Sequence, residues 1–414
     1  MILTIKHLFF LTLILPFLSG FTVSKQDHSA DPESRSLQAD RIVRVSLFSL
    51  NPPDSVRITS EASSIRFYSD QVSVELSDLS IDVAVKISEN RLYLETSGIK
   101  QEIDSLMVIS DDLPARLISE PHGYRYYHGR LLLKPGRDNR SIEIINSVPL
   151  ESYIAAVVGS EMNFEHPEAL KAQAVVSRTY ALWSIAGSPY PDFDVRDYEA
   201  NQVYLGHLPD RPRYEEATQQ TRGEILTWSD QLILAVFSST CGGHTSNNED
   251  VWAGEPHPYL RALNDGGSCS ASPHYEWSYT LHRDDMDELL RERYGFRYRS
   301  AELQKDQTER VSHLILKNGQ GRELRFTGNE FRLMINATFG PMAIRSTRFS
   351  WVEEENDIII EGSGMGHGVG MCQWGALGLA ENGWNYKDIL SFYFSGVKIV
   401  NLGDIESNQL PLYQ

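Results

Sequence analysis

Apolar and polar residues alternate over short stretches in the first third of the chain. The alternation is clearest at Val72–Leu76, and apolar residues also dominate the runs 41–48 and 131–133. A period of two residues predicts strands with one buried face. Turn-forming residues such as those at 51–54 separate the runs. Residues 41–140 are therefore expected to form a β-rich domain, and they contain no ionisable cluster that suggests a site.

The pattern becomes helical after this region. The segment 149–158 begins with proline and is followed by Gly159, which predicts a helix that stops at the glycine. A second helix is expected over 167–187. It has a narrow face of small and apolar residues that allows close packing: Leu170, Ala174, Ser177 and Ala181. Later patterns predict a strand over 232–237, helices over 283–294 and 373–383, and a hairpin with strands 312–316 and 323–327.

Glu161 lies at the junction of the first two predicted helices. A carboxyl group at such a corner can be half-buried with a raised pKa, which a general acid for glycosidic cleavage needs. A solvated loop glutamate is the alternative that this segment alone leaves open.

A glycine-rich segment lies near the C-terminus. Glycine occupies every second position from 362 to 370, with His367 inside the run and Gln373 just after it. Repeated glycine gives a strand little to pack, but it lets a backbone approach a ligand or another segment closely. The spacing is neither a dinucleotide fingerprint nor a phosphate-binding loop. His367 and Gln373 are thus candidates for the wall of a site; the alternative is a tight barrel corner with a packed histidine.

Several longer blocks occur in a fixed order along the chain. They are Val-Pro-Leu-Glu-Ser-Tyr at 148–153, Ser-Glu-Met at 160–162, the helical segment 168–181, Gln-Val-Tyr-x-Gly at 202–206, Ser-Thr-Cys-Gly-Gly-His-Thr at 239–245, Pro-Tyr-Leu-Arg at 258–261 and the segment 366–376. This series resembles the stage II sporulation protein D and amidase enhancer (SpoIID/LytB) family. The resemblance covers about residues 141 to 400, and several blocks are nearly intact.

The resemblance implies a peptidoglycan lytic transglycosylase with Glu161 as its general acid/base. Such enzymes cut the bond between N-acetylmuramic acid and N-acetylglucosamine when the muramic 6-hydroxyl closes on its own anomeric carbon, which leaves a 1,6-anhydro end. One carboxyl group suffices, whereas a hydrolase normally uses a second one. Asp194 and Asp197 are the candidates for a second carboxylate. A non-catalytic activator of a cell-wall amidase is the alternative function, because family members have also been named amidase enhancers.

Other residues are expected to handle substrate on the same grounds. The candidates are His367, Gln373, Arg178, Tyr180, Gln202, Tyr204, Ser239, His244, Gly366 and Gly368. Arg178 is expected to hold a sugar carboxylate or to pair with Glu161, and Tyr180 is alternatively a core residue. Because a lone carboxyl group cannot orient a polysaccharide, we also expect residues 366–368 to lie within contact range of Glu161.

The fold class expected from these elements is α+β. A β-rich N-terminal accessory domain precedes a mixed α/β catalytic domain over 141–402, with helices around the catalytic glutamate and a glycine-rich C-terminal loop. A variable subdomain is expected at about 276–350, and a C-terminal tail at 403–414.

The three cysteines are Cys241, Cys269 and Cys372. Cys241 with His244, and Cys269 with His274, have a two-Cys, two-His spacing typical of a structural zinc site. A disulfide between Cys241 and Cys269 is a second interpretation, and buried free thiols are a third. We expect catalysis itself to require no cofactor.

The sequence departs from the family pattern in three places. Cys372 stands where the family usually has serine, and Met365 replaces a more usual aromatic residue. The loop 195–202 lacks the cysteine and histidine residues with which some members bind a metal, so that metal site is expected to be absent.

The N-terminal segment and the charge indicate where the protein works. Residues 1–24 contain Lys6 and a short apolar core, which predicts a secretory signal peptide, and 25–40 are a polar linker. We expect an exported protein that is periplasmic, cell-wall-associated or extracellular; an uncleaved membrane anchor is the alternative.

The net charge is −18 without a basic cluster, which argues against nucleic acid as a partner. The family resemblance implies peptidoglycan glycan strands stripped of stem peptides, and a cell-wall amidase, as partners.

Overall fold

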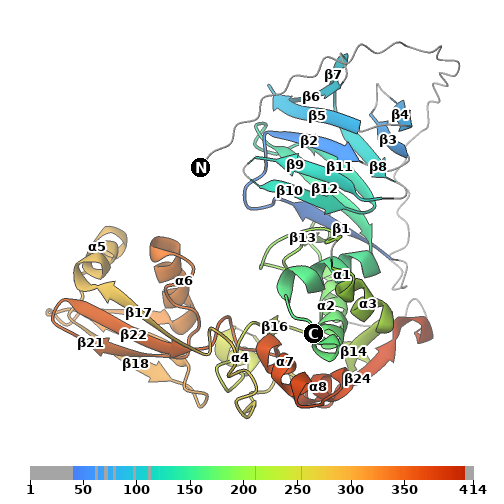
Figure 1. Ribbon diagram of the computed structural model, residues 1–414. Coiled ribbons are helices and arrows are strands. Elements are labelled where there is room, and N and C mark those ends of the chain that lie inside the picture. Colours follow the sequence, from blue (N-terminus) through green and yellow to red (C-terminus); the bar gives the residue numbers. More distant parts are fainter. Residues whose placement is uncertain are drawn as a thin grey trace, which may run out of the picture. The chain divides into compact units, whose positions relative to one another are not determined.

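Two β-sheets form the N-terminal region of the computed structural model (Figure 1). Their strands are β1 (Ile42–Leu47), β2 (Ser55–Ser60), β3 (Ser64–Tyr68), β4 (Ser73–Ser77), β5 (Ile81–Ser88), β6 (Arg91–Thr96), β7 (Ile99–Ile103), β8 (Leu106–Ser110), β9 (Ala115–Ser119), β10 (Gly123–Tyr127), β11 (Arg130–Pro135), β12 (Ile142–Pro149) and the later β13 (Val195–Arg196). One sheet has the order β13-β1-β12-β11-β8-β3-β4, and the other has the order β10-β9-β2-β5-β6-β7.

The structure describes residues 41–405 except 61–63, 70–72, 78–80, 97–98, 111–112, 121, 210 and 253. The expected signal peptide 1–24, the linker 25–40 and residues 406–414 of the expected tail lie outside the described residues. Within the described part of the chain, no helix combines the length and apolar character needed to cross a membrane.

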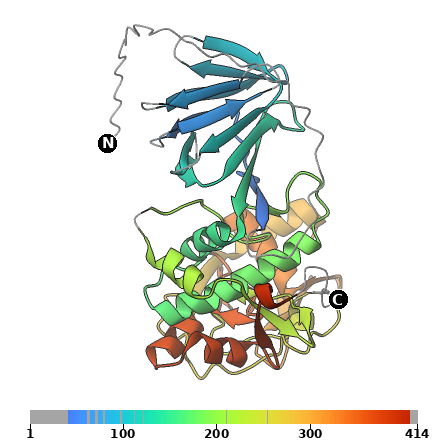
Figure 2. The ribbon, with the colours of Figure 1, turned by 90° about the vertical axis from the view of Figure 1, so that its right-hand side faces the viewer.

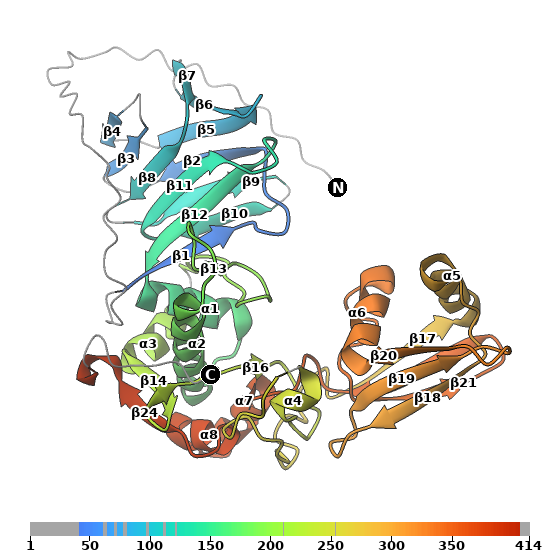
Figure 3. The same ribbon diagram turned by 180° about the vertical axis from the view of Figure 1, so that it is seen from behind.

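The period-two pattern produces the expected strands. In β1 the alternate residues Val43, Val45 and Leu47 are buried, because successive side chains of a strand point to opposite faces. The run 131–133 lies in β11, and most of Val72–Leu76 lies in β4, with Val72 itself outside the described residues. The first sheet continues past residue 140, because β12 pairs with both β1 and β11 and leads directly into the first helix (Figure 3).

Three helices follow the sheet and pack against one another (Figure 2). They are α1 (Leu150–Glu161), α2 (Pro167–Ala186) and α3 (Arg213–Gln220). The expectation that Gly159 ends the first helix is wrong. Gly159 lies inside α1, where an added Cβ would lie 2.6 Å from the Tyr214 ring and 2.7 Å from Leu208. This glycine therefore allows α1 to approach α3 closely, and the helix continues to Glu161.

Further helices and short strands complete this part of the chain, and several of them pack against α2. They are β14 (Glu224–Trp228), β15 (Gln231–Leu232), β16 (Phe237–Ser238), α4 (Asn248–Val251), β23 (Met371–Cys372), α7 (Gln373–Glu381), α8 (Tyr386–Tyr393), β24 (Lys398–Asn401) and the 3-10 helix η1 (Leu402–Asp404). The expected helix near 373–383 is confirmed by α7. The expected strand over 232–237 is wrong in its middle: Ile233 and Ala235 are buried in the core but have no strand partner.

Residues 276–363 form a subdomain with its own hydrophobic core, which includes Leu290, Leu314 and Phe331. Its elements are β17 (Glu276–His282), α5 (Arg283–Tyr294), β18 (Ser300–Lys305), β19 (Val311–Lys317), β20 (Glu323–Thr327), α6 (Gly328–Phe339), β21 (Phe349–Glu353) and β22 (Asp357–Ser363). The predicted helix 283–294 and the predicted hairpin are confirmed by α5 and by the antiparallel pair β19 and β20. With these helices and sheets the fold class is α+β, as predicted.

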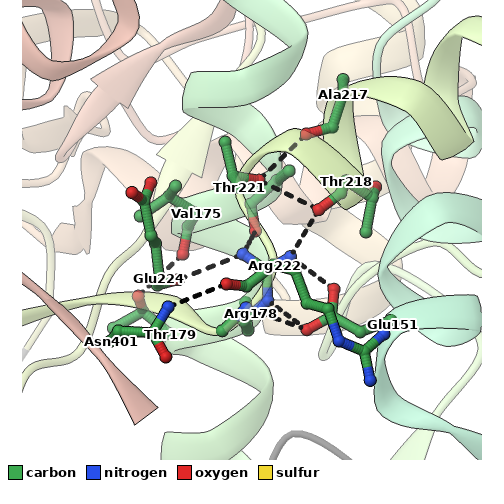
Figure 4. A network of polar contacts seen from close by, with 12 residues as sticks. Glu151, Val175, Arg178, Thr179, Ala217, Thr218, Thr221, Arg222, Glu224 and Asn401 are labelled. Carbon is green, nitrogen blue, oxygen red and sulfur yellow. Dashed lines mark hydrogen bonds and ion pairs between the residues drawn. The ribbon is translucent and has the colours of Figure 1, made fainter. Parts of the chain in front are cut away.

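A buried ion pair joins α1 to α2 (Figure 4). The Arg178 guanidinium donates to both carboxylate oxygens of Glu151, at 2.9 Å and 2.6 Å, and also to the carbonyl oxygens of Thr218 and Glu224. The Arg178 side chain is fully buried and that of Glu151 is 11% exposed. Glu151 also accepts from the Gly223 amide at 3.2 Å. Arg178 therefore fixes α1, α2, α3 and β14 relative to one another, and it is neither a partner of Glu161 nor a ligand of a sugar carboxylate.

We predict that Arg178→Gln lowers the free energy of unfolding by about 3–5 kcal/mol, because it leaves the Glu151 carboxylate buried without its cation. Urea unfolding measures the change. The double variant Arg178→Met/Glu151→Leu should lose less, because it removes both charges. A loss below about 1 kcal/mol in Arg178→Gln, the value typical of a surface pair, would contradict the structural role.

Candidate active site

Glu161 is the last residue of α1, and a loop closes over it. The Val203 amide donates to Glu161 Oε1 at 2.6 Å, and the Leu205 amide donates to Ser160 Oγ at 3.1 Å. The two bonds hold residues 203–205 against the end of the helix. The carboxyl group is partly buried rather than solvated on a loop.

The surroundings of Glu161 raise its pKa to about 7. Burial is the largest cause, because it disfavours the charged form, and the negative charge of Glu199 adds to it. The hydrogen bond from Val203 acts in the opposite direction. A carboxyl group with a pKa near 7 can donate a proton and take one back at neutral pH, which general acid/base catalysis requires.

Two buried residues, Gln202 and Tyr204, flank the Val203 amide that donates to Glu161. Gln202 is fully buried and donates to the Ser177 carbonyl oxygen at 3.3 Å. Tyr204 is 1% exposed; its hydroxyl donates to Asn146 Oδ1 at 2.6 Å. The expectation that these two side chains bind substrate is corrected, since fully buried side chains cannot contact a polysaccharide. Their anchoring instead fixes the Val203 amide between them.

Gln373 connects the C-terminal segment to this corner. Its Nε2 atom donates to the Glu161 carbonyl oxygen at 3.4 Å and to Gln173 Oε1 at 3.3 Å. Gln373 begins α7, directly after the glycine-rich segment, so the start of α7 lies at the end of α1.

The alternating glycines adopt the backbone angles that favour glycine, with φ between +71° and +100° at Gly364, Gly366, Gly368 and Gly370. Their close contacts are with other segments of the protein. An added Cβ would clash with the Arg310 guanidinium at Gly368 and would lie 3.0 Å from Ser238 Cβ at Gly366. Gly368 is buried, so its direct contact with substrate is corrected to close packing on Arg310.

His367 is held on both sides. The Val369 amide donates to its Nδ1 atom at 3.1 Å, and its ring centroid lies 4.8 Å from that of Trp252. Burial lowers the pKa of His367 to about 4, and the side chain is therefore neutral near pH 7. A neutral imidazole can accept or donate a hydrogen bond but carries no charge. Contact between residues 366–368 and Glu161 stays a prediction.

Tyr180 and Ser239 lie near these groups. Tyr180 is partly buried, and the charge of Glu161 contributes to raising its pKa, although burial is the largest cause. The Ser239 carbonyl oxygen accepts from the Trp374 amide at 3.1 Å, which ties the segment after β16 to the start of α7. The substrate role predicted for these two residues stays a prediction.

One aromatic pair was missed by the sequence analysis. The rings of Phe164 and Trp374 meet edge to face, with centroids 4.8 Å apart, and both residues are partly exposed. Phe164 follows Glu161 on the chain and Trp374 follows Gln373, so the pair lies beside the contact between those two residues. Trp374 stood in a recognised block, but no local signal indicated that Phe164 would meet it.

The two aspartates considered as a second carboxylate are anchors of the scaffold. Asp194 forms a bidentate pair with Arg44 on β1, with an Nη2–Oδ1 distance of 2.8 Å. Asp197 accepts from the Phe48 and Ser49 amides at 2.7 Å and 3.1 Å. Both are less than 9% exposed, so neither is free to activate a water molecule.

The cysteines are free thiols in the structure. Cys241 and Cys269 come together as expected, with their sulfur atoms 3.6 Å apart. The two histidines of the expected ligand set do not join them: the Nδ1 atoms of His244 and His274 interact with the Thr245 carbonyl oxygen and with Arg345. Asp265 and Cys372 complete the group in their place.

A cavity of about 200 Å³ lies between α1 and α3, on a part of α1 other than Glu161. His128, His207 and Glu215 line it, and the two imidazole rings have centroids 4.5 Å apart. His207 lies 3.3 Å from Glu215, which is exposed. Glu161 does not line this cavity, so the cavity is separate from the candidate acid.

Comparisons with known proteins agree with the motif blocks. A model of the stage II sporulation protein family matches residues 138–228. An uncharacterized protein of Brachyspira hyodysenteriae is 31% identical over 89% of this chain and 96% of its own length. Stage II sporulation protein D of Bacillus amyloliquefaciens is 30% identical over 63% of this chain and 76% of its own length. The amidase enhancer of Bacillus subtilis is 28% identical, and the match covers 56% of this chain and 38% of that protein.

We predict that Glu161→Gln stabilises the protein at alkaline pH. The carboxyl pKa is raised from 4.5 to about 7 on folding, so wild type loses stability as the pH rises between these values, whereas glutamine does not ionise. The melting temperature of the variant relative to wild type should rise by a few degrees from pH 5 to pH 8. Glu165→Gln, at an exposed position four residues on, controls for the chemical change. A variant less stable than wild type at pH 8 would contradict the burial of an ionisable Glu161.

Proposed function

The chain belongs to the stage II sporulation protein D and amidase enhancer family, and from this premise we propose that it is a lytic transglycosylase of peptidoglycan. The family relationship gives the protein a role in the cell wall. The observation that carries the finer proposal is the Glu161 carboxyl group, partly buried with a pKa of about 7, while Asp194 and Asp197 are occupied by other partners.

The proposed reaction uses Glu161 twice. The protonated carboxyl group first donates its proton to the oxygen that leaves with N-acetylglucosamine, and the bond from this oxygen to the anomeric carbon of N-acetylmuramic acid breaks. The bonding electrons stay on the leaving oxygen, and positive charge develops on the muramic ring. The Glu161 carboxylate then takes the proton of the muramic 6-hydroxyl as its oxygen bonds to the anomeric carbon. The proton count balances without water, and the carboxyl group returns to its starting form.

Other residues support this chemistry by position. Gln373 meets the main chain of Glu161, and the aromatic pair Phe164 and Trp374 offers partly exposed ring surface beside it. We propose that a sugar ring packs on this pair, because the two aromatic rings offer a large apolar surface. His367 and Tyr180 supply neutral hydrogen-bonding groups for the glycan.

We propose that the protein is exported, on the signal-like pattern of residues 1–24. The family resemblance supports glycan strands without stem peptides as the substrate, and the net charge of −18 fits this proposal because the chain would repel acidic peptides. Activation of a cell-wall amidase is the second candidate, favoured by the relative named amidase enhancer. A catalytic role requires the Glu161 carboxyl group, whereas a purely activating role does not.

We predict that Glu161→Gln lowers the rate of glycan cleavage by about 10²–10⁴-fold, because it keeps the side-chain shape and removes proton transfer. Purified wild type and variant are incubated with peptide-stripped glycan, and the masses of the products are measured by mass spectrometry. Wild type should release 1,6-anhydro ends, and Glu165→Gln should behave like wild type. Ordinary reducing ends would mean hydrolysis. Equal rates of cleavage by wild type and Glu161→Gln would rule out Glu161 as the general acid/base. If wild type cleaves no glycan but stimulates an added amidase, the result would favour the amidase-activator function.

The pH profile provides a separate test of the same carboxyl group. Cleavage needs protonated Glu161, so kcat/KM should fall as the pH rises through about 7. Glu199→Gln removes a negative charge that raises the Glu161 pKa, and the alkaline limb should therefore move to lower pH. An alkaline limb that stays in place or moves upward in Glu199→Gln would assign it to another group.

A further inference from the structure

Four buried side chains from three separate segments meet at one point of the protein. Cys241, Cys269 and Cys372 are completely buried and Asp265 is 2% exposed. Their sulfur and carboxylate oxygen atoms all lie within 4.8 Å of one another. Cys241 Sγ is 3.6 Å from Cys269 Sγ and 3.0 Å from Asp265 Oδ2.

These distances fit a tetrahedral metal site. Zinc binds thiolate sulfur at about 2.3 Å, so two sulfur ligands at tetrahedral angles are about 3.8 Å apart. The separation of Cys241 from Cys269 is close to that value. Sulfur-rich tetrahedral sets favour zinc among the common divalent ions. We propose that Cys241, Asp265, Cys269 and Cys372 bind one structural zinc ion.

The backbone around the sulfur atoms suits thiolates. Cys372 Sγ accepts from the Cys241 amide at 3.2 Å and from the Gly375 amide at 3.3 Å, the latter as the N-terminal cap of α7. Amide donors of this kind stabilise negative charge on sulfur. Among the described residues, the buried Asp265 carboxylate accepts from the Gly267 amide and from the Cys241 thiol, both at 3.0 Å. A thiol is a weak donor, so without an ion the burial of this charge is costly.

Two further buried groups border the cluster and suit a negatively charged metal complex. The Tyr393 hydroxyl is buried and has no hydrogen-bond partner among the described residues. An added Cβ at Gly375 would touch both this hydroxyl and Asp265 Oδ2, so the two oxygens face the same point of α7. The guanidinium of Arg310 is 1% exposed; its Nη2 donates to the Cys241 carbonyl oxygen at 2.8 Å, and its Nε and Nη1 atoms have no partner in the described part of the chain. Three thiolates and a carboxylate outweigh the charge of one zinc ion, and Arg310 offsets part of the excess.

The ion would join segments that the proposed catalytic site needs together. Cys241 follows β16, Asp265 and Cys269 lie on the loop before β17, and Cys372 ends β23 immediately before Gln373. Gln373 contacts the main chain of Glu161. Zinc at this cluster therefore fixes the start of α7 and acts as a positioning element for Gln373.

Metal binding to the full-length, reduced protein tests the proposal directly. Zinc content is measured by elemental analysis, and Co²⁺ is titrated into the metal-free protein while thiolate-to-cobalt charge-transfer absorption is followed. We expect one zinc or one cobalt per chain with thiolate bands. Iron in place of zinc, three reactive thiols without metal, or a Cys241–Cys269 disulfide in protein purified without reductant would overturn it.

Variants identify the ligands independently of catalysis. Cys372→Ser, which removes one sulfur and keeps the size, and Asp265→Asn should each weaken Zn²⁺ retention in a chelator competition. His244→Ala and His274→Ala should retain the metal and serve as matched controls. Tyr393→Phe, which deletes only the hydroxyl, should weaken retention by about 10-fold. Loss of metal from the histidine variants, with retention in Cys372→Ser and Asp265→Asn, would overturn the proposed ligand set. If a cysteine variant fails to fold, the cobalt spectrum of wild type still decides.

Discussion

The ion pair between Arg178 and Glu151 is the interaction on which the geometry of the candidate site depends. It fixes one end of α1 against α2 and β14, while the Val203 amide holds the other end at Glu161. Burying two charges is expensive, and the bidentate geometry with several carbonyl acceptors offsets that cost. Because α1 is held at both ends, the position of its last residue, Glu161, is fixed.

The same corner shows a conflict between stability and chemistry. Burial of Glu161 disfavours its charged form, so the residue is a liability for folding at neutral pH and above. The surrounding residues hold Glu161 in this position. Gln202 and Tyr204 are buried on either side of Val203, and the Val203 amide donates to the carboxyl group. An apolar residue would suit the scaffold better at this position, and the proposed proton transfer gives the buried carboxyl group a reason to be there.

The C-terminal part of the chain completes the site from a distance. The alternating glycines let residues 364–370 run closely against Arg310, Ser238 and the segment after β16, and the chain then enters α7 with Gln373 against Glu161. The thiols and carboxyl group that meet beside the N-terminus of α7 are 131 positions apart at their widest, from Cys241 to Cys372. The packed core and the proposed zinc ion would thus both hold the start of α7 in place. Loss of the metal cluster would therefore displace Gln373 from the main chain of Glu161.

The sequence by itself determined the elements whose signals are local. The apolar runs predicted β1 and β11, the helical pattern predicted α2 and α5, and turn chemistry predicted the hairpin of β19 and β20. The ordered blocks identified the family and selected Glu161. Tertiary structure decided which polar side chains belong to the scaffold, because burial depends on partners far along the chain. Arg178, Gln202 and Tyr204 looked like site residues and became buried anchors, and Gly159 proved to be a packing position rather than a helix stop. Asp265 and Cys372 joined Cys241 and Cys269 for the same reason: the segments that carry them meet only in the folded chain, and sequence spacing gives no measure of that distance.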